Sequence, residues 1–300
     1  MATPGRLITA MVTPFDDTGK VNYQQAQKLA LALLGSGSDG VLVSGTTGES
    51  PTLTRDEKLR LFAEIKSTVG ERGAVIAGTG SYNTIAACEL TKVAEQTGVD
   101  AILLVVPYYN KPTQEGLYQH FKTIASCTKL PCILYNVPSR TVINMTADTV
   151  IRLSKIDNII GVKEASGNLN QIARIIDGTR DNFLVYSGND GDTLHTLTLG
   201  GFGVVSVASH LVGRQIANMI EKSISGEIWE AADIHHHLLP LIKTLFVVSN
   251  PSPIKCALNH IGFLVGKPRL PLVEPDGKSA LLIKSTLKDY HIDLPVKLKR

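Results

Sequence analysis

The chain of 300 residues has a formal charge of +3, with 43% apolar and 19% charged residues, and this composition excludes a disordered or fibrous protein. The small positive excess is spread along the chain and gives no indication of binding to nucleic acid. Because no apolar run approaches the roughly 20 residues of a membrane span and residues 1–6 lack a signal-peptide pattern, we expect a cytoplasmic protein with no membrane partner and four reduced, mostly buried cysteines.

Eight short apolar runs follow one another along the chain, each ending in small or turn-forming residues. The runs are continuous rather than alternating, which is typical of strands buried on both faces. We expect strands at 7–12, 40–44, 74–77, 101–106, 132–136, 159–163, 183–186 and 203–207.

Stretches with apolar residues at helical spacing separate these runs. Thr54 and Glu57 have the spacing of a capping box, and Gly98 suits the end of a helix. The expected helices are 23–34, 55–69, 84–97, 114–126, 146–155, 169–178, 192–199 and 216–225. Eight βα units within 225 residues predict a TIM barrel, an α/β fold. The rival doubly wound sheet usually has a glycine-rich turn after its first strand, and residues 11–15 form none.

Residues 226–300 contain helical pieces and prolines but no further βα unit. We expect a catalytic barrel domain over 1–225 and a helical domain over 226–300. His235, His236 and His237 lie on the first helix of this appendage. Neighbouring residues of a helix point about 100° apart, so three in a row chelate one metal poorly, and we expect no metal site there.

Reactive side chains follow several of the predicted strands, at the end where TIM barrels carry their active sites. Thr46 and Thr47 lie between glycines after the second strand. Their hydroxyls and the nearby backbone amides suit a small carboxylate, although an ordinary glycine-rich turn has the same composition. Phenol and guanidinium groups follow the fourth and fifth strands, at Tyr108, Tyr109, Tyr135 and Arg140.

Lys163 ends the apolar run of the sixth strand. A buried lysine cation is costly, so this amine is either paired, for example with Glu164, or its pKa is lowered. A neutral lysine is the nucleophile of Schiff-base catalysis. A weaker pattern at 189–192 resembles part of a metal loop, but capping of the next helix is enough to explain it.

Four motifs together resemble one family: GTTGES at 45–50, PYYNKP at 107–112, YNVPSRT at 135–141 and GVKEASGN at 161–168. From about Leu7 to about Asn259 the chain resembles the dihydrodipicolinate synthases, in the class I aldolase superfamily that also holds N-acetylneuraminate lyase. The resemblance implies a lyase that condenses pyruvate with L-aspartate 4-semialdehyde in diaminopimelate and lysine biosynthesis, without a metal or organic cofactor.

The resemblance also implies roles for single residues. Lys163 would form the imine with pyruvate, and Tyr135 would pass protons. Thr46 would complete a proton relay with Tyr109, which would cross from a neighbouring subunit. The chain is therefore expected to form dimers, which pair into a tetramer. The substrate-binding groups would be Thr47, Gly188, the backbone near Val205 and, for the carboxylate of aspartate semialdehyde, Arg140.

Lysine-inhibited members of the family carry an acidic residue early in the helix after the GTG motif, and histidines on the preceding helix. Aligned without gaps from Gly78, the acidic position here is Ala86, and the histidine positions are Arg55 and Lys58. The ammonium of lysine would meet repulsion, so we expect no feedback inhibition. Glu89, one helical turn further on, is an alternative carboxylate.

Three other functions fit parts of this pattern. Sialic acid lyase-like enzymes share the lysine and first tyrosine but lack PYYNKP and the arginine at the barrel mouth. Sugar-acid aldolases such as 2-keto-3-deoxygluconate aldolase keep most motifs but need polyol-binding groups. A non-catalytic sensor of 2-oxo acids on the same barrel would not need the proton-relay residues.

Overall fold

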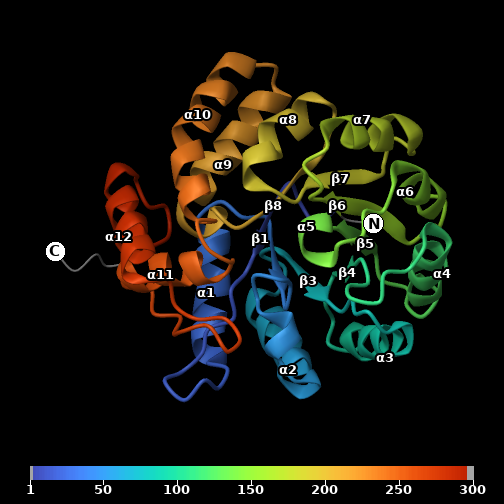
Figure 1. Ribbon diagram of the computed structural model, residues 1–300, viewed down its shortest axis with the longest axis horizontal. Helices are drawn as coiled ribbons and strands as arrows, with labels where there is room; N and C mark the ends of the chain where they lie inside the picture. The colour runs from blue at the N-terminus through green and yellow to red at the C-terminus, as the bar shows by residue number, and fades with distance from the viewer. Residues whose placement is uncertain (1–2, 296–300) are drawn as a thin grey trace.

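The fold is a closed barrel of eight parallel strands that pair in sequence order. It is seen in a computed structural model that describes residues 3–295 (Figure 1). The strands are β1 (Leu7–Ala10), β2 (Gly40–Val43), β3 (Ala74–Gly78), β4 (Ala101–Val105), β5 (Cys132–Asn136), β6 (Ile159–Glu164), β7 (Leu184–Ser187) and β8 (Gly203–Ser206). The predicted TIM barrel is confirmed.

Helices surround the barrel. They are α1 (Tyr23–Gly35), α2 (Arg55–Val69), α3 (Thr84–Glu95), α4 (Gln114–Ala125), α6 (Ala147–Leu153), α7 (Leu169–Gly178), α8 (Thr193–Thr198) and α9 (Ser209–Ile224). The predicted capping box opens α2, where Thr54 and Glu57 each accept a hydrogen bond from the other's backbone N–H. The predicted C-cap is wrong by two residues, because α3 ends at Glu95 and Gly98 lies in the turn beyond, with φ +80°.

The apolar side chains form two separate clusters, because successive strand residues face opposite ways. Thirteen buried residues, Tyr135 and Val205 among them, fill the inside of the barrel. The larger cluster lies between the strands and the helices. Of the four free cysteines, Cys88 and Cys132 are buried and the other two are partly exposed.

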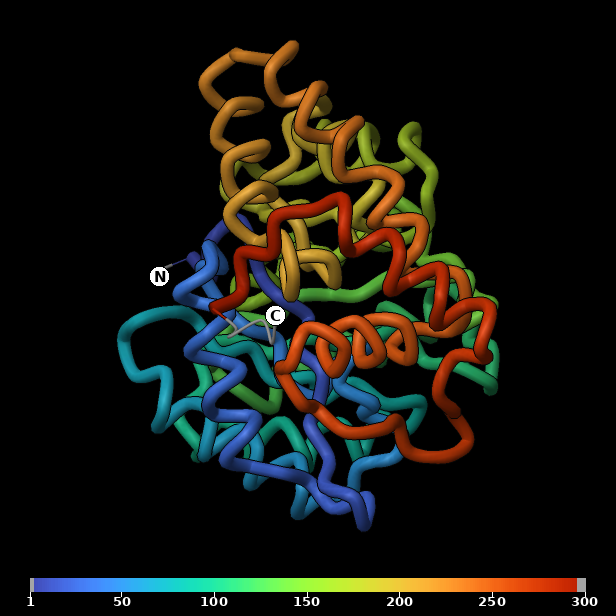
Figure 2. The backbone as a smooth tube through the Cα atoms, turned by 90° about the vertical axis from the view of Figure 1, so that its left-hand side faces the viewer, coloured from blue at the N-terminus to red at the C-terminus, as the bar shows by residue number. Residues whose placement is uncertain are grey.

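The C-terminal part of the chain is helical, with α10 (Ile228–Thr244), α11 (Ser252–His260) and α12 (Gly277–Thr286). Figure 2 shows this segment crossing the side of the barrel formed by α1 and α9. Residues of α10 and α11 join the larger apolar cluster of the barrel helices. The division into two domains stays a prediction, and its outer limits, 1–2 and 296–300, lie outside the described residues.

Two further features differ from the expected elements. Helix α9 begins at Ser209 rather than 216, because a first turn precedes non-helical backbone at Val212 and the apolar spacing becomes regular only after it. A short helix, α5 (Pro138–Thr141), lies between the expected strand at 132–136 and the expected helix at 146–155, where no helix was expected, and Pro138 begins it with a fixed φ. Among the described residues no helix is long and apolar enough to cross a membrane.

Candidate active site

Lys163 lies inside the barrel near the end of β6. Its side chain is only 5% exposed, and its Nζ lies 4.3 Å from the centre of the Tyr135 ring. Within residues 3–295 it forms no ion pair with a carboxylate. Tyr135 is its direct neighbour on β5 in the strand register. A buried amine beside a phenol is the arrangement from which a lysine nucleophile can form an imine.

Glu164 faces the other side of β6 and does not pair with Lys163. Its carboxylate accepts hydrogen bonds from Asn136 Nδ2 at 3.0 Å, Gln171 Nε2 at 3.1 Å and the Ser166 amide at 2.8 Å. Burial raises the pKa of Glu164, while these donors act in the opposite direction. The structural ion pair that the sequence left open is thus not formed.

A cavity of about 240 Å³ opens beside Tyr135, at the C-terminal ends of β2 to β5. In a TIM barrel this is the end that carries the active site. Its lining includes Ser44, Thr46, Ser50, Tyr108, Tyr135 and Arg140. Four of the residues singled out from the sequence, Thr46, Tyr108, Tyr135 and Arg140, therefore share one cavity, with Lys163 packed against Tyr135.

The two threonines after β2 lie in different surroundings. Thr46 lines the cavity and is partly exposed. Thr47 is 3% exposed, and its Oγ1 accepts a hydrogen bond from Asn250 Nδ2 at 2.9 Å. That contact leaves the hydroxyl proton of Thr47 free to donate to a further acceptor. No sequence pattern indicated Asn250, which follows α10 some 200 residues later.

Arg140 reaches the cavity from α5. Its side chain is exposed, and no carboxylate among the described residues pairs with it. A free guanidinium at the cavity mouth can bind a carboxylate through two parallel hydrogen bonds.

The two tyrosines after β4 take different positions. Tyr108 lines the cavity, and its ring packs edge-on against Tyr82 with centroids 5.1 Å apart. Tyr109 does not line the cavity and is 92% exposed, with its backbone in the left-handed region at φ 75°. The single chain thus leaves Tyr109 apart from Thr46 and Tyr135.

The ends of β7 and β8 hold the remaining predicted groups. Val205 is buried inside the barrel, and the Gly188 amide donates to Glu164 O at 2.7 Å. A Cβ at Gly188 would lie 2.6 Å from Ala165 Cβ, so no larger residue fits without movement. Neither residue is among those that line the cavity.

Asp190 was missed by the sequence prediction, which assigned residues 189–192 to helix capping. Its fully buried carboxylate instead accepts hydrogen bonds from the Ser206 hydroxyl, the Val207 amide at 2.9 Å and the Ala208 amide. It thereby fixes the chain just after Val205. Burial raises the pKa of Asp190, and these three donors oppose that effect.

The histidines of α10 lie in different surroundings. His235 is buried and its ring lies edge-on to His195 with centroids 5.5 Å apart, while His236 and His237 are exposed. Among the described residues no group of three or more histidine, cysteine or acidic side chains could hold a metal ion.

A barrel of eight βα units, with a buried lysine on the sixth strand against a tyrosine on the fifth, defines an enzyme of the Schiff-base, class I aldolase type. The Dihydrodipicolinate synthetase family model matches residues 3–290, and the chain belongs to this family. It is a lyase that uses a covalent imine on lysine in place of an external cofactor.

Known proteins agree with this membership. The chain is 66% identical to a 4-hydroxy-tetrahydrodipicolinate synthase from Dehalococcoides mccartyi, over 98% of this chain and 99% of the relative. The structure of dihydrodipicolinate synthase DapA-2 from Bacillus anthracis matches with a TM-score of 0.95 and 46% identity, over 97% and 99% of the two chains. A lysine-bound enzyme from Cyanidioschyzon merolae matches with a TM-score of 0.94 and 48% identity, over 95% and 98%.

Proposed function

We propose that the protein is a 4-hydroxy-tetrahydrodipicolinate synthase, which condenses pyruvate with L-aspartate 4-semialdehyde in diaminopimelate and lysine biosynthesis. One observation carries the chemistry: the amine of Lys163 is buried, unpaired among the described residues, and packed against a tyrosine that lines the cavity.

The reaction begins with attack of the Lys163 amine on C2 of pyruvate, and loss of water gives the imine. The protonated imine withdraws electrons, so the methyl group can release a proton and form an enamine. Tyr135 lies next to Lys163, with its ring centre 4.3 Å from the amine, and passes protons in these steps. Thr46 and Tyr109 complete the relay to solvent, with Tyr109 supplied by a neighbouring subunit, which its exposure in the single chain permits.

The second half of the reaction consumes aspartate semialdehyde. The enamine carbon attacks the aldehyde, and the amine of the substrate then adds to C2 and displaces Lys163 by ring closure. Arg140 at the cavity mouth binds the carboxylate of this substrate. Thr47, Gly188 and the backbone near Val205 hold the carboxylate of pyruvate.

Three further properties complete the proposal. The protein acts in the cytoplasm. It forms a dimer, because the relay needs Tyr109 of a second subunit, and two dimers pair into a tetramer. It is insensitive to lysine. Supporting this, a methyl group stands at the acidic position, since Ala86 is the third residue of α3, and Arg55 and Lys58 lie in the first turn of α2.

The proposal is tested by the choice of aldehyde. With pyruvate present, we expect turnover of aspartate semialdehyde and little turnover of glyceraldehyde, the aldehyde partner of a sugar-acid aldolase. Preferential turnover of glyceraldehyde would identify the sugar-acid aldolase instead. Binding of pyruvate without turnover of either aldehyde would identify a sensor.

A further inference from the structure

The loop after β2 is held in an unusual backbone conformation. Ser44 and Glu49, which flank Thr46 and Thr47, both lie in the left-handed region, with φ of 58° and 56°. Residues with a Cβ adopt this region only where their surroundings enforce it. The same loop forms one wall of the cavity through Ser44, Thr46 and Ser50. Its shape therefore depends on contacts that hold Glu49.

Lys255 of α11 provides the first such contact. Its Nζ lies 2.5 Å from Glu49 Oε1, and the side chains are 1% and 0% exposed. The ammonium also lies 4.0 Å from the centre of the Phe15 ring and donates to the carbonyl of Lys267 at 3.2 Å. A buried carboxylate is costly unless it is paired, so the ion pair with Lys255 holds Glu49 in place.

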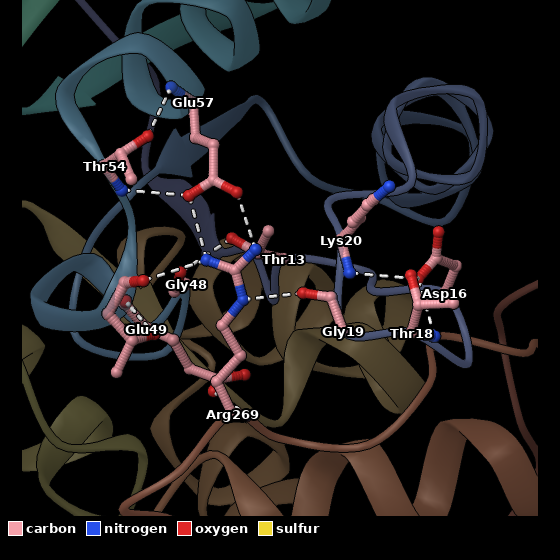
Figure 3. Close-up of polar contacts among 11 residues, drawn as sticks. Thr13, Asp16, Thr18, Gly19, Lys20, Gly48, Glu49, Thr54, Glu57 and Arg269 are labelled. Atoms are coloured by element: carbon pink, nitrogen blue, oxygen red, sulfur yellow. Dashed lines mark hydrogen bonds and ion pairs between the residues drawn. The ribbon is translucent and has the colours of Figure 1, made fainter.

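Arg269 provides the second contact. Its backbone amide donates to the other carboxylate oxygen of Glu49 at 2.8 Å. Its guanidinium donates to the Thr52 carbonyl at 2.9 Å and to both carboxylate oxygens of Glu57, at 2.9 and 2.6 Å. Figure 3 shows the Arg269 side chain between Glu57 and Glu49 of the loop. Residues 255–269 thus tie both the loop and the start of α2 in place.

We propose that Lys255 is a positioning residue for pyruvate: with Arg269 it fixes Glu49, and thereby sets Thr46 against the cavity and Thr47 directly after it. The hydrogen bond from Asn250 to Thr47 is an independent link from the same C-terminal part of the chain. This inference rests on the proposed function. It gives the helical appendage a role in binding the first substrate, although Lys255 itself does not line the cavity.

The test measures the steady-state KM of Lys255→Met for each substrate. The variant should lose one hydrogen bond to the pyruvate carboxylate, so its pyruvate KM should rise about tenfold. The KM for aspartate semialdehyde, measured at saturating pyruvate, should stay within about twofold of the wild-type value. Lys66→Met is the matched control, because Lys66 pairs with Asp100 away from the loop. It should leave both KM values unchanged.

The double variant Glu49→Gln with Lys255→Met leaves no unpaired charge in the interior and covers the case in which the single variant does not fold. It should show the same rise in pyruvate KM. A lower melting temperature or kcat with a normal pyruvate KM, in either variant, would mean that the ion pair is only structural. If the wild-type protein forms no pyruvate adduct, the proposed function fails together with this inference. If the adduct forms but the pyruvate KM of the variants is unchanged, only this inference fails.

Discussion

His210 joins the ends of β1 and β8, and we expect it to make the barrel unstable in acid. Its Nδ1 donates to the carbonyl of Val207 at 2.9 Å, and its Nε2 accepts from the Val12 amide at 3.1 Å. Both ring nitrogens are therefore satisfied by the neutral tautomer. A proton on Nε2 would face the Val12 N–H, which would then have no acceptor. The His210 side chain is also fully buried.

The size of the effect follows from the two pKa values. Burial lowers the pKa of His210 to about 4, whereas a histidine in the unfolded chain titrates near 6.5. Between these values the unfolded chain binds the extra proton, so stability falls as the pH falls. From pH 7 to pH 5 the loss is about 2 kcal/mol for His210. His120, whose pKa burial also lowers to about 4, contributes a similar loss.

Urea unfolding at pH 7 and pH 5 measures this dependence. The wild-type protein should lose stability between the two conditions, and the loss in His210→Gln should be about 2 kcal/mol smaller. His237→Gln, at an exposed position, should behave as the wild type. An equal loss in the wild type and in His210→Gln would refute the assignment of acid sensitivity to this residue.

Three other outcomes are expected. Arg140→Ala should weaken use of aspartate semialdehyde by about 1.5 to 3 kcal/mol while pyruvate imine formation is retained, measured from kcat/KM and adduct yield; equal losses in both would make Arg140 structural. Asp190→Ala strands two amides and a hydroxyl in the interior, so urea unfolding should show a loss of about 2 to 4 kcal/mol, and a change below 1 kcal/mol would contradict the contacts described. Initial rates should be unaffected by lysine, and half-inhibition at submillimolar lysine would show that another group, such as Glu89, meets its ammonium.

The barrel could be predicted from the sequence because its signal is repeated eight times. Each strand is a continuous apolar run, and each run is buried on both faces in the structure. The errors lie where the local signal is short. Residues 138–141 form a single helical turn that no spacing pattern can reveal, and the first turn of α9 lies before the kink at Val212.

The candidate site could be predicted where a residue type is unusual for its position. Lys163 in an apolar strand and Arg140 at a strand end are such cases. The contacts that hold the site in place could not be predicted from the sequence, because they join residues about 200 positions apart. Asn250 with Thr47 and Lys255 with Glu49 are brought together only when the C-terminal segment packs on the barrel.

The central claim is that Lys163 forms an imine with pyruvate. The direct test incubates the protein with pyruvate, reduces it with borohydride and maps the adduct by mass spectrometry of peptides. We predict one reduced pyruvate adduct, located on Lys163, and none in a folded Lys163→Ala variant. An adduct on another lysine, or one that persists in Lys163→Ala, would contradict the account.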